Sequence, residues 1–150
     1  MLVRELMTSP AVTVDEGQSA TTVIRLLDRF HVSSLPVVDE KGQLVGIIGE
    51  ADVIGDAAVL GEPVDSGWGT PPRACVRERM VSRVVGVDSD ADVVDAVALM
   101  SRAALKSVPV LHKGRVVGMF SRSDVVRAAA ERESYRPSTR AGPSDARNVT

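Results

Sequence analysis

The chain contains 150 residues, of which 44% are hydrophobic and 25% are charged, and its 18 basic and 20 acidic side chains leave a formal net charge of −2. This balance excludes a general nucleic-acid binder, because phosphate affinity requires a basic field. The single cysteine, Cys75, excludes an intramolecular disulfide and a thiolate metal cluster. Since no apolar run approaches the roughly 18 residues of a membrane span, we expect a soluble cytoplasmic protein with no membrane partner.

In the first half of the chain, segments with strand-like and helix-like hydrophobic patterns follow one another in a definite order. Residues 12–14 predict a short strand, and Ser19 is a good N-cap for the amphipathic helix that follows. The apolar runs 35–38 and 44–48, separated by a glycine-containing turn, predict a hairpin, and a closing helix is expected from about Glu50. The proline in the first of these runs favours a position at a sheet edge or a strand start.

The same order returns in the second half of the chain. Residues 84–87 predict a strand, Asp92 caps the next helix, the runs 108–111 and 116–120 predict a second hairpin, and a closing helix is expected from about Arg122. Each copy therefore reads as strand, helix, strand, strand, helix. The expected fold class is mixed α/β (α+β), with a crossover helix covering one face of each small sheet.

The two copies also match residue by residue. The segment that begins at Val3 aligns with the segment that begins at Val76, 73 positions later, and the offset holds until one residue drops out near Lys41. With the offset then 72, Gly46 falls on Gly118. Because about fifty residues bury little surface alone, we expect the two copies to pack against each other into one body.

This pattern divides the chain into four parts. They are a first repeat domain at 1–60, a Gly/Pro-rich linker at 61–75, a second repeat domain at 76–130 and a C-terminal tail at 131–150. The tail has almost no aliphatic residues from about Glu131 onward. We therefore expect it to be disordered and to contribute little to stability.

The duplicated pattern resembles the cystathionine β-synthase (CBS) domain family. Each copy carries a methionine near its start, an aliphatic-Pro-Val strand, a Gly-aliphatic-aliphatic strand and an aspartate in the opening turn of its last helix. The resemblance covers residues 3 to about 130. It implies a tandem pair that forms a compact, disc-like module, usually dimerises, and binds adenosine-containing ligands in clefts between the two copies.

The ligand signature of that family is Gly, two apolar residues, Ser or Thr, two variable residues and Asp, and the second copy carries it from Gly118 to Asp124. By resemblance, Asp124 accepts hydrogen bonds from the ribose hydroxyls and Ser121 contacts a phosphate. A helix N-terminus favours a phosphate because it presents unpaired N–H groups and a partial positive charge. Arg122 and Lys106 add positive charge at the same place.

The resemblance also implies that apolar strand residues sandwich the base of the ligand. These residues are Val84, Val85 and Val108. In the first copy the signature is degraded, because Gly49 replaces the hydroxyl residue and Glu50 places a carboxylate beside the expected phosphate position, although Asp52 remains able to hold a ribose. We therefore expect asymmetric sites, of which the second is the better.

Several of these residues also have simpler interpretations. Ser121 and Asp124 have the spacing of a helix capping box, which contributes about 1 kcal/mol without any ligand. His31 and His112 lie in different elements with no metal-binding spacing between them, and Cys75 has no neighbour that would activate it. No nucleophile with its base, Walker-type loop or dinucleotide fingerprint occurs, so we expect neither a metal site nor an enzyme.

We therefore expect a stand-alone regulatory module that senses AMP, ADP, ATP or S-adenosylmethionine, requires no cofactor and acts on an unidentified partner protein. The alternative is a constitutive protein-interaction module that binds no nucleotide, which Gly49 and Glu50 favour. Apolar residues cover most of the circumference of the helix expected between Asp92 and Leu105. This predicts homodimerisation through the crossover helices.

Overall fold

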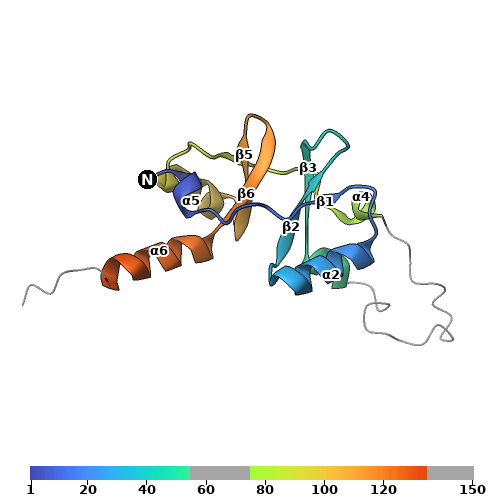
Figure 1. The fold of residues 1–150 in the computed structure, drawn as a ribbon, viewed down its shortest axis with the longest axis horizontal. Helices are drawn as coiled ribbons and strands as arrows, with labels where there is room; N and C mark the ends of the chain where they lie inside the picture. Colours follow the sequence, from blue (N-terminus) through green and yellow to red (C-terminus); the bar gives the residue numbers. More distant parts are fainter. Residues whose placement is uncertain (55–74, 135–150) are drawn as a thin grey trace, which may run out of the picture.

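The protein, seen in a computed structural model that describes residues 1–54 and 75–134, contains two three-stranded sheets, one from each copy. The sheets stand side by side, and helices lie below and outside them (Figure 1). This arrangement confirms the mixed α/β class and the tandem organisation. Positions 61–74 of the expected linker and positions 135–150 of the expected tail lie outside the described residues.

The elements of the first copy follow the expected order, with a short helix added before the first strand. They are α1 (Val3–Leu6), β1 (Val14–Asp15), α2 (Ala20–Phe30), β2 (Ser34–Val38), β3 (Leu44–Gly49) and α3 (Glu50–Ile54). Ser19 caps α2 as predicted, because its side chain accepts a hydrogen bond from the N–H of Thr22 at 3.3 Å. The apolar stripe of α2 then buries Val23 and Leu27 against the first sheet.

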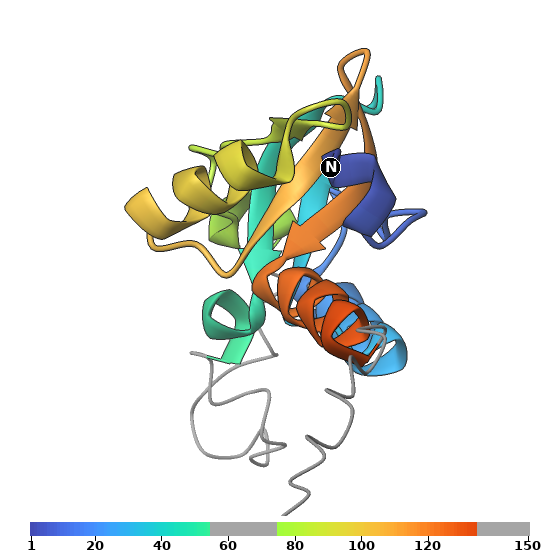
Figure 2. The ribbon, with the colours of Figure 1, turned by 90° about the vertical axis from the view of Figure 1, so that its left-hand side faces the viewer.

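The second copy repeats this order. Its elements are α4 (Val76–Arg79), β4 (Val87–Asp88), α5 (Val93–Arg102), β5 (Ser107–His112), β6 (Arg115–Ser121) and α6 (Arg122–Ser134). Asp92 caps α5 as predicted, with its Oδ1 atom accepting from the N–H of Val94 at 2.8 Å. Helices α6 and α2 both lie below the two sheets, as a second view shows (Figure 2).

The proline-containing strands occupy the centre of each sheet, which corrects the expectation of an edge position. The strand orders are β1-β2-β3 and β4-β5-β6. Pro36 faces Ile47, whose N–H and C=O both bond outward to Val81, so this pair needs no hydrogen bond across the hairpin. On the other side, β1 begins to pair only at Val37. The missing N–H of the proline therefore removes no ladder bond, and Pro109 repeats this arrangement.

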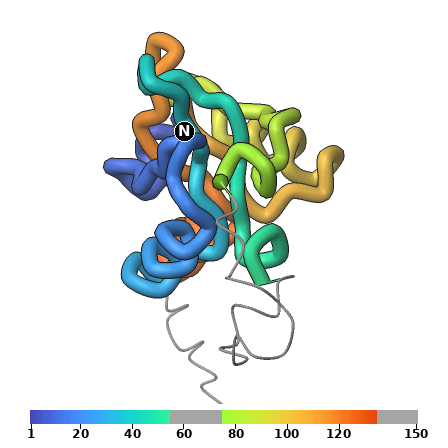
Figure 3. Tube along the Cα trace, turned by 90° about the vertical axis from the view of Figure 1, so that its right-hand side faces the viewer, coloured from blue at the N-terminus to red at the C-terminus, as the bar shows by residue number. Residues whose placement is uncertain are grey.

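The short leading helices are exchanged between the copies, a feature that the repeat pattern did not reveal. Val3 of α1 is fully buried in the core of the second copy, and its N–H donates to the carbonyl of Ala91 at 2.9 Å. Val76 of α4 is fully buried in the core of the first copy and donates to the carbonyl of Gln18 at 2.8 Å. Figures 1 and 3 show α4 beside the first sheet. The spatial units therefore differ from the sequence units at their starts.

A glycine in the last strand of each sheet makes this exchange possible. A Cβ atom on Gly118 would lie 2.7 Å from Sδ of Met7 and 2.8 Å from the carbonyl oxygen of Thr8. A Cβ atom on Gly46 would lie 2.5 Å from Sδ of Met80. Only a residue without a side chain leaves room for the methionine that follows the exchanged helix. The methionine and glycine of the repeat pattern are thus contact partners between copies.

Helix α6 continues to Ser134, so residues 131–134 are helical where disorder was expected. The run of alanines that precedes Glu131, and the long charged side chains that follow, have high helix propensity, which outweighs their lack of apolar contacts. Among the side chains of α6, that of Asp124 is buried. Neither in residues 1–54 nor in residues 75–134 does any helix have the length and hydropathy that crossing a membrane demands.

Helix α5 is less apolar on its outer face than its sequence suggested. Ala96 and Met100 are buried in the second core, and Val93, Val97 and Leu99 pack partly against it. The large side chain left outside is that of Val94, which is 73% exposed. Homodimerisation through this helix stays a prediction.

Candidate functional site

A cavity of about 540 Å³ lies between the two copies, and we call it the inter-repeat cavity. Its walls come from four parts of the chain: residues 8–12, residues 31–35, Lys106 with Ser107, and residues 119–127. The first two parts belong to the first sequence copy and the last two to the second. Both copies are therefore needed to form it, as expected for a pair that binds ligands between its members.

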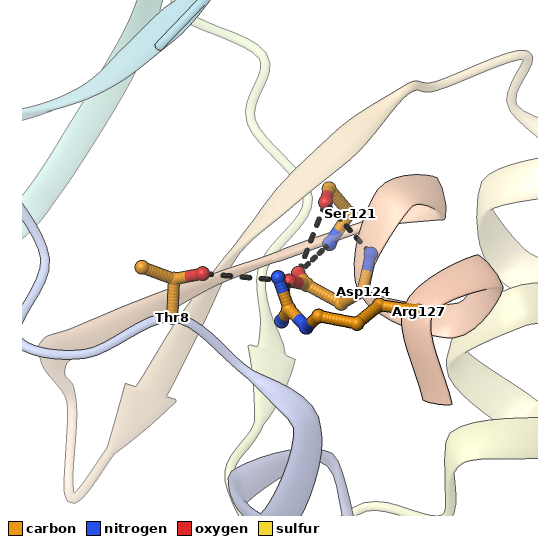
Figure 4. A network of polar contacts seen from close by, with 4 residues as sticks. All are labelled: Thr8, Ser121, Asp124 and Arg127. Atoms are coloured by element: carbon orange, nitrogen blue, oxygen red, sulfur yellow. Dashed lines mark hydrogen bonds and ion pairs between the residues drawn. The ribbon is translucent and has the colours of Figure 1, made fainter. Parts of the chain in front are cut away.

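Asp124 is the buried charged group of this cavity, with only 4% of its surface exposed. Its Oδ2 atom accepts hydrogen bonds from the N–H of Ser121 at 2.8 Å and from its Oγ at 3.0 Å. In return, the Oγ of Ser121 accepts from the N–H of Asp124 at 3.3 Å. The two residues thus form the reciprocal cap that their spacing predicted, and the cap holds Oδ2 in place (Figure 4).

The other carboxylate oxygen of Asp124 faces two residues that the sequence reasoning missed. Nη2 of Arg127 donates to Oδ1 at 2.7 Å, and Oγ1 of Thr8 lies 3.4 Å from the same atom (Figure 4). Arg127 sits one helical turn after Asp124, so helix geometry alone could have identified it. Thr8 is 116 residues away, and no local pattern signals that contact.

The start of α6 offers a single unbonded first-turn amide to a ligand. The N–H of Arg122 donates to the carbonyl of Lys106 at 3.1 Å, and the N–H of Asp124 is taken by Ser121. Within the described residues, the N–H of Ser123 has no hydrogen-bond partner. The side chains of Lys106 and Arg122 both line the cavity and are exposed, and their contact with a phosphate stays a prediction.

The apolar wall of the inter-repeat cavity comes from residues other than those predicted. Val108 is 1% exposed and lies within the second core, and Val84 and Val85 lie outside the cavity lining, so a contact of these three residues with a base stays a prediction. Their places are taken by Ala11 and Val12, which the 73-residue offset aligns with Val84 and Val85. The reason is the exchange of leading segments: Thr8 pairs with Met119, and this carries residues 8–12 across the second copy's cavity.

The corresponding group of the first copy is arranged differently. Oδ2 of Asp52 accepts from the N–H of Gly49 at 2.8 Å, so the aspartate caps α3, but Asp52 does not line the inter-repeat cavity. Glu50 donates its N–H to the carbonyl of Ser33 at 3.0 Å, which matches the bond between Arg122 and Lys106. The backbone arrangement is thus the same in both copies. The hydroxyl of Ser121 and the positive charge of Arg122 have no counterpart in the first copy, where Gly49 and Glu50 take their places.

The histidines and the cysteine do not converge. His31 ends α2 in a left-handed conformation (φ 52°) and lines the cavity from the first copy, while His112 lies in the second hairpin with its Nδ1 3.1 Å from Oγ of Ser89. Sγ of Cys75 donates to the carbonyl of Glu16. Across residues 1–54 and 75–134, no group of three or more histidine, cysteine or acidic side chains is placed to hold a metal ion.

Comparison with known sequences identifies the repeated unit. A family model described as the CBS domain matches residues 3–57 and 76–131. The chain is 28% identical over 153 residues to the protein MJ1426 of Methanocaldococcus jannaschii, with 85% of this chain and 90% of that protein covered. Two other relatives from the same organism are longer, and the chain spans 23% and 44% of their lengths.

Two solved structures combine this fold with a bound adenosine compound. The CBS domain pair of protein MJ0100, in complex with 5′-methylthioadenosine and S-adenosyl-L-methionine, is 27% identical with a TM-score of 0.72, covering 88% of this chain and 98% of that chain. CBSX2, in complex with AMP, is 26% identical with a TM-score of 0.71, covering the same shares.

Proposed function

The chain belongs to the CBS domain family, and from this premise we propose that it is a regulatory module that binds an adenosine nucleotide in its inter-repeat cavity. Asp124 holds the two ribose hydroxyls, and Ser121, Lys106 and Arg122 contact the phosphate. The module passes the binding event to a partner protein. Asp52 contributes at most to a weaker second site.

The observation that carries this proposal is the buried carboxylate of Asp124 at the wall of a cavity large enough for a ligand. A carboxylate with one oxygen fixed by a cap and the other turned toward a cavity is suited to accept hydrogen bonds from a vicinal diol. The bound AMP of CBSX2 and the adenosine compounds of MJ0100 make a nucleoside the leading ligand class. About a quarter of the aligned residues are identical between each of these proteins and this chain, so the exact ligand is part of the proposal.

The charge of the cavity favours a phosphorylated ligand. Lys106, Arg122 and Arg127 line it together with one carboxylate, that of Asp124. Such a surplus of cations attracts a phosphate and disfavours a sulfonium compound such as S-adenosylmethionine. We therefore rank AMP, ADP and ATP above S-adenosylmethionine.

The remaining parts of the proposal concern assembly. We propose that the chain divides functionally into CBS domains at 1–60 and 76–130, that it forms a homodimer through its crossover helices, and that it has no catalytic role and needs no cofactor. In this dimer the exposed Val94 of α5 would lie at the interface. A sedimentation experiment that finds a monomer at tens of micromolar, on the order usual for such work, would contradict the dimer.

A second function is a constitutive protein-interaction module that binds no nucleotide. The observation in its favour is that both oxygens of Asp124 already have protein partners, so the aspartate is explained as a helix cap and ion-pair acceptor. The degraded signature at Gly49 and Glu50 points the same way.

Calorimetry with AMP, ADP, ATP and S-adenosylmethionine separates the two functions. Binding of at least one of the nucleotides, lost in Asp124→Ala and retained in Asp52→Ala, is the result we expect. If none of the four compounds binds the wild-type protein at millimolar concentration, the nucleotide proposal is wrong and the interaction module takes its place.

A further inference from the structure

The side chain of Arg127 covers the carboxylate oxygen of Asp124 that the cap with Ser121 leaves open. Oδ2 of Asp124 is fully used by the cap with Ser121, so a ligand hydroxyl can approach only Oδ1. That oxygen already accepts from Nη2 of Arg127 at 2.7 Å, with the hydroxyl of Thr8 at 3.4 Å. Because an oxygen has two lone pairs, a diol cannot bind there while the guanidinium stays in place.

The Arg127 side chain is nevertheless free to leave. It is 58% exposed, its partner lies only three residues earlier on the same helix, and no other ion pair to it occurs among the described residues. Because the side chain of Asp124 is only 5% exposed, its carboxylate needs other hydrogen bonds when the guanidinium leaves. Only a ligand that supplies such hydrogen bonds to Oδ1 can therefore displace the guanidinium.

What happens to the displaced charge depends on the ligand. Arg127 itself lines the inter-repeat cavity, beside Lys106 and Arg122. A phosphate in the cavity gives the freed guanidinium a new partner, so one ion pair is exchanged for another. A neutral nucleoside offers no such partner, and its binding simply breaks the existing ion pair.

We propose that Arg127 is a specificity-determining residue that makes Asp124 available to nucleotides and withholds it from nucleosides. The inference rests on the proposed nucleotide function and adds a means of discrimination to it. The first copy has Gly55 at the position that the 72-residue offset aligns with Arg127, so this means of discrimination is specific to the second copy's sequence.

The test compares AMP with adenosine in wild type, Arg127→Met and Arg132→Met by calorimetry. Methionine keeps the length of the arginine stem without its charge or donors, and Arg132 is an exposed arginine of the same helix outside the cavity lining. In Arg127→Met we expect adenosine to bind more tightly and AMP more weakly. The ratio of the two dissociation constants should therefore fall about tenfold, as expected for the loss of one charge-assisted contact.

The same experiment separates failure of this inference from failure of the function. Suppose that both ligands bind the wild type. If Arg127→Met changes their two dissociation constants by one common factor, or leaves both unchanged, Arg127 does not discriminate between the ligands and the inference is wrong. A tenfold loss of discrimination in Arg132→Met as well would also overturn it, because the effect would then be one of net charge. If neither ligand binds the wild type, the nucleotide function fails and the inference fails with it.

Arg127→Lys is a second variant, and it tests whether the positive charge at this position causes the preference for AMP. Lysine keeps the positive charge but lacks the planar fork that bonds a carboxylate. We expect it to retain the preference for AMP over adenosine. A loss of that preference equal to the loss in Arg127→Met would show that the charge near the phosphate is not the cause, and would contradict the inference.

Discussion

The hydroxyl oxygens of Ser34 and Ser107 lie 3.1 Å apart, and the two residues are equivalent positions of the repeat, 73 residues apart in the chain. A residue that contacts its own counterpart lies on the axis that relates the two copies. Ser34 begins β2 and Ser107 begins β5, so the axis passes between the central strands. Both serines line the inter-repeat cavity, which therefore lies beside the axis and not deep within either copy.

The Ser34 and Ser107 pair gives the first prediction. Replacing either serine by alanine removes their shared hydrogen bond and should lower the free energy of unfolding by about 1 kcal/mol, the usual net contribution of one such bond. Because the second replacement has no bond left to break, the double variant should cost little more than one single variant. Urea unfolding followed by circular dichroism measures all three. Strictly additive costs would show that the two hydroxyls do not interact.

The exchanged leading helices give the second prediction. Val3 is fully buried in the second core, although its neighbours in the sequence continue into the first copy. Val3→Ala should therefore destabilise the protein by roughly 2 kcal/mol through the loss of buried methyl groups. Val76→Ala should do the same in the first core. Each of these helices belongs to the core of the other copy. Each variant should therefore unfold in a single transition whose midpoint is lower than that of the wild type.

A matched control is Val126→Ala, because Val126 lies on α6 with 68% of its surface exposed. The free energy of unfolding of Val126→Ala should stay within about 0.5 kcal/mol of that of the wild type. Two separate transitions in Val3→Ala, one of them unshifted, would mean that the copies unfold independently and that the exchange does not couple them.

The fold could be predicted from the sequence to the extent that it depends on local pattern. The repeat, the caps at Ser19 and Asp92 and the two hairpins follow from periodicity and side-chain chemistry, which act over a few residues. The central position of Pro36 could not be predicted in this way. It depends on whether the residue opposite Pro36 directs its backbone hydrogen bonds toward the proline or away from it, and the pairing of Ile47 with Val81 decides this.

The candidate site was less predictable than the fold. Ser121 and Asp124 were found because they belong to one short motif, and Lys106 and Arg122 because they flank it. The base-contacting residues Val84, Val85 and Val108 remain a prediction that the cavity lining does not favour. Their assignment drew the base-contacting residues of the second site from the second copy alone. The crossing of residues 8–12 changes the walls without leaving any signal in the local sequence.

Two glycines give the third prediction, because they differ in the reason for having no side chain. Gly118→Ala should be the more harmful change, costing roughly 1–3 kcal/mol, since its Cβ would lie 2.8 Å from the backbone oxygen of Thr8. Gly114 adopts φ +77° in a hairpin turn with nothing within 4 Å of an added Cβ. Gly114→Ala should cost only about 1 kcal/mol, from backbone strain.

Thermal unfolding of Gly114→Ala and Gly118→Ala checks this order. Met7→Ala in the Gly118→Ala background offers a further test, because the Sδ atom of Met7 lies 2.7 Å from the added Cβ. Met7 also packs against the second core, so its removal has a cost of its own. If steric conflict is the cause, the double variant should cost less than the sum of the two single variants. A larger cost at Gly114 than at Gly118 would show that turn geometry, and not the approach of the exchanged segment, is the stricter requirement.

The last prediction concerns the asymmetry between Asp124 and Asp52. A ligand present at about 100 times its dissociation constant should stabilise the protein by roughly 2.7 kcal/mol. For a chain of this size that corresponds to a rise in melting temperature of roughly 5–10 °C. Asp124→Ala should abolish most of the rise, because the ribose hydroxyls lose their acceptor. Asp52→Ala should retain most of it, since Asp52 lies outside the cavity lining.

Asp52→Ala is a close control because both aspartates cap the helix that follows their strand: Asp52 accepts from Gly49 at 2.8 Å and Asp124 from Ser121 at 2.8 Å. Asp52→Ala should lose ligand-free stability on the order of 1 kcal/mol, as for a cap. Asp124→Ala should lose more, because Asp124 also bonds Oγ of Ser121 and Nη2 of Arg127. The quantity to compare is therefore the ligand-induced rise in melting temperature of each variant, measured from its own ligand-free value. Lys106→Ala should reduce that rise for AMP more than for adenosine, because only AMP carries a charge for the ammonium group. An equal loss of the rise in both aspartate variants would contradict the asymmetry, and would mean that the first copy binds the ligand as strongly as the second.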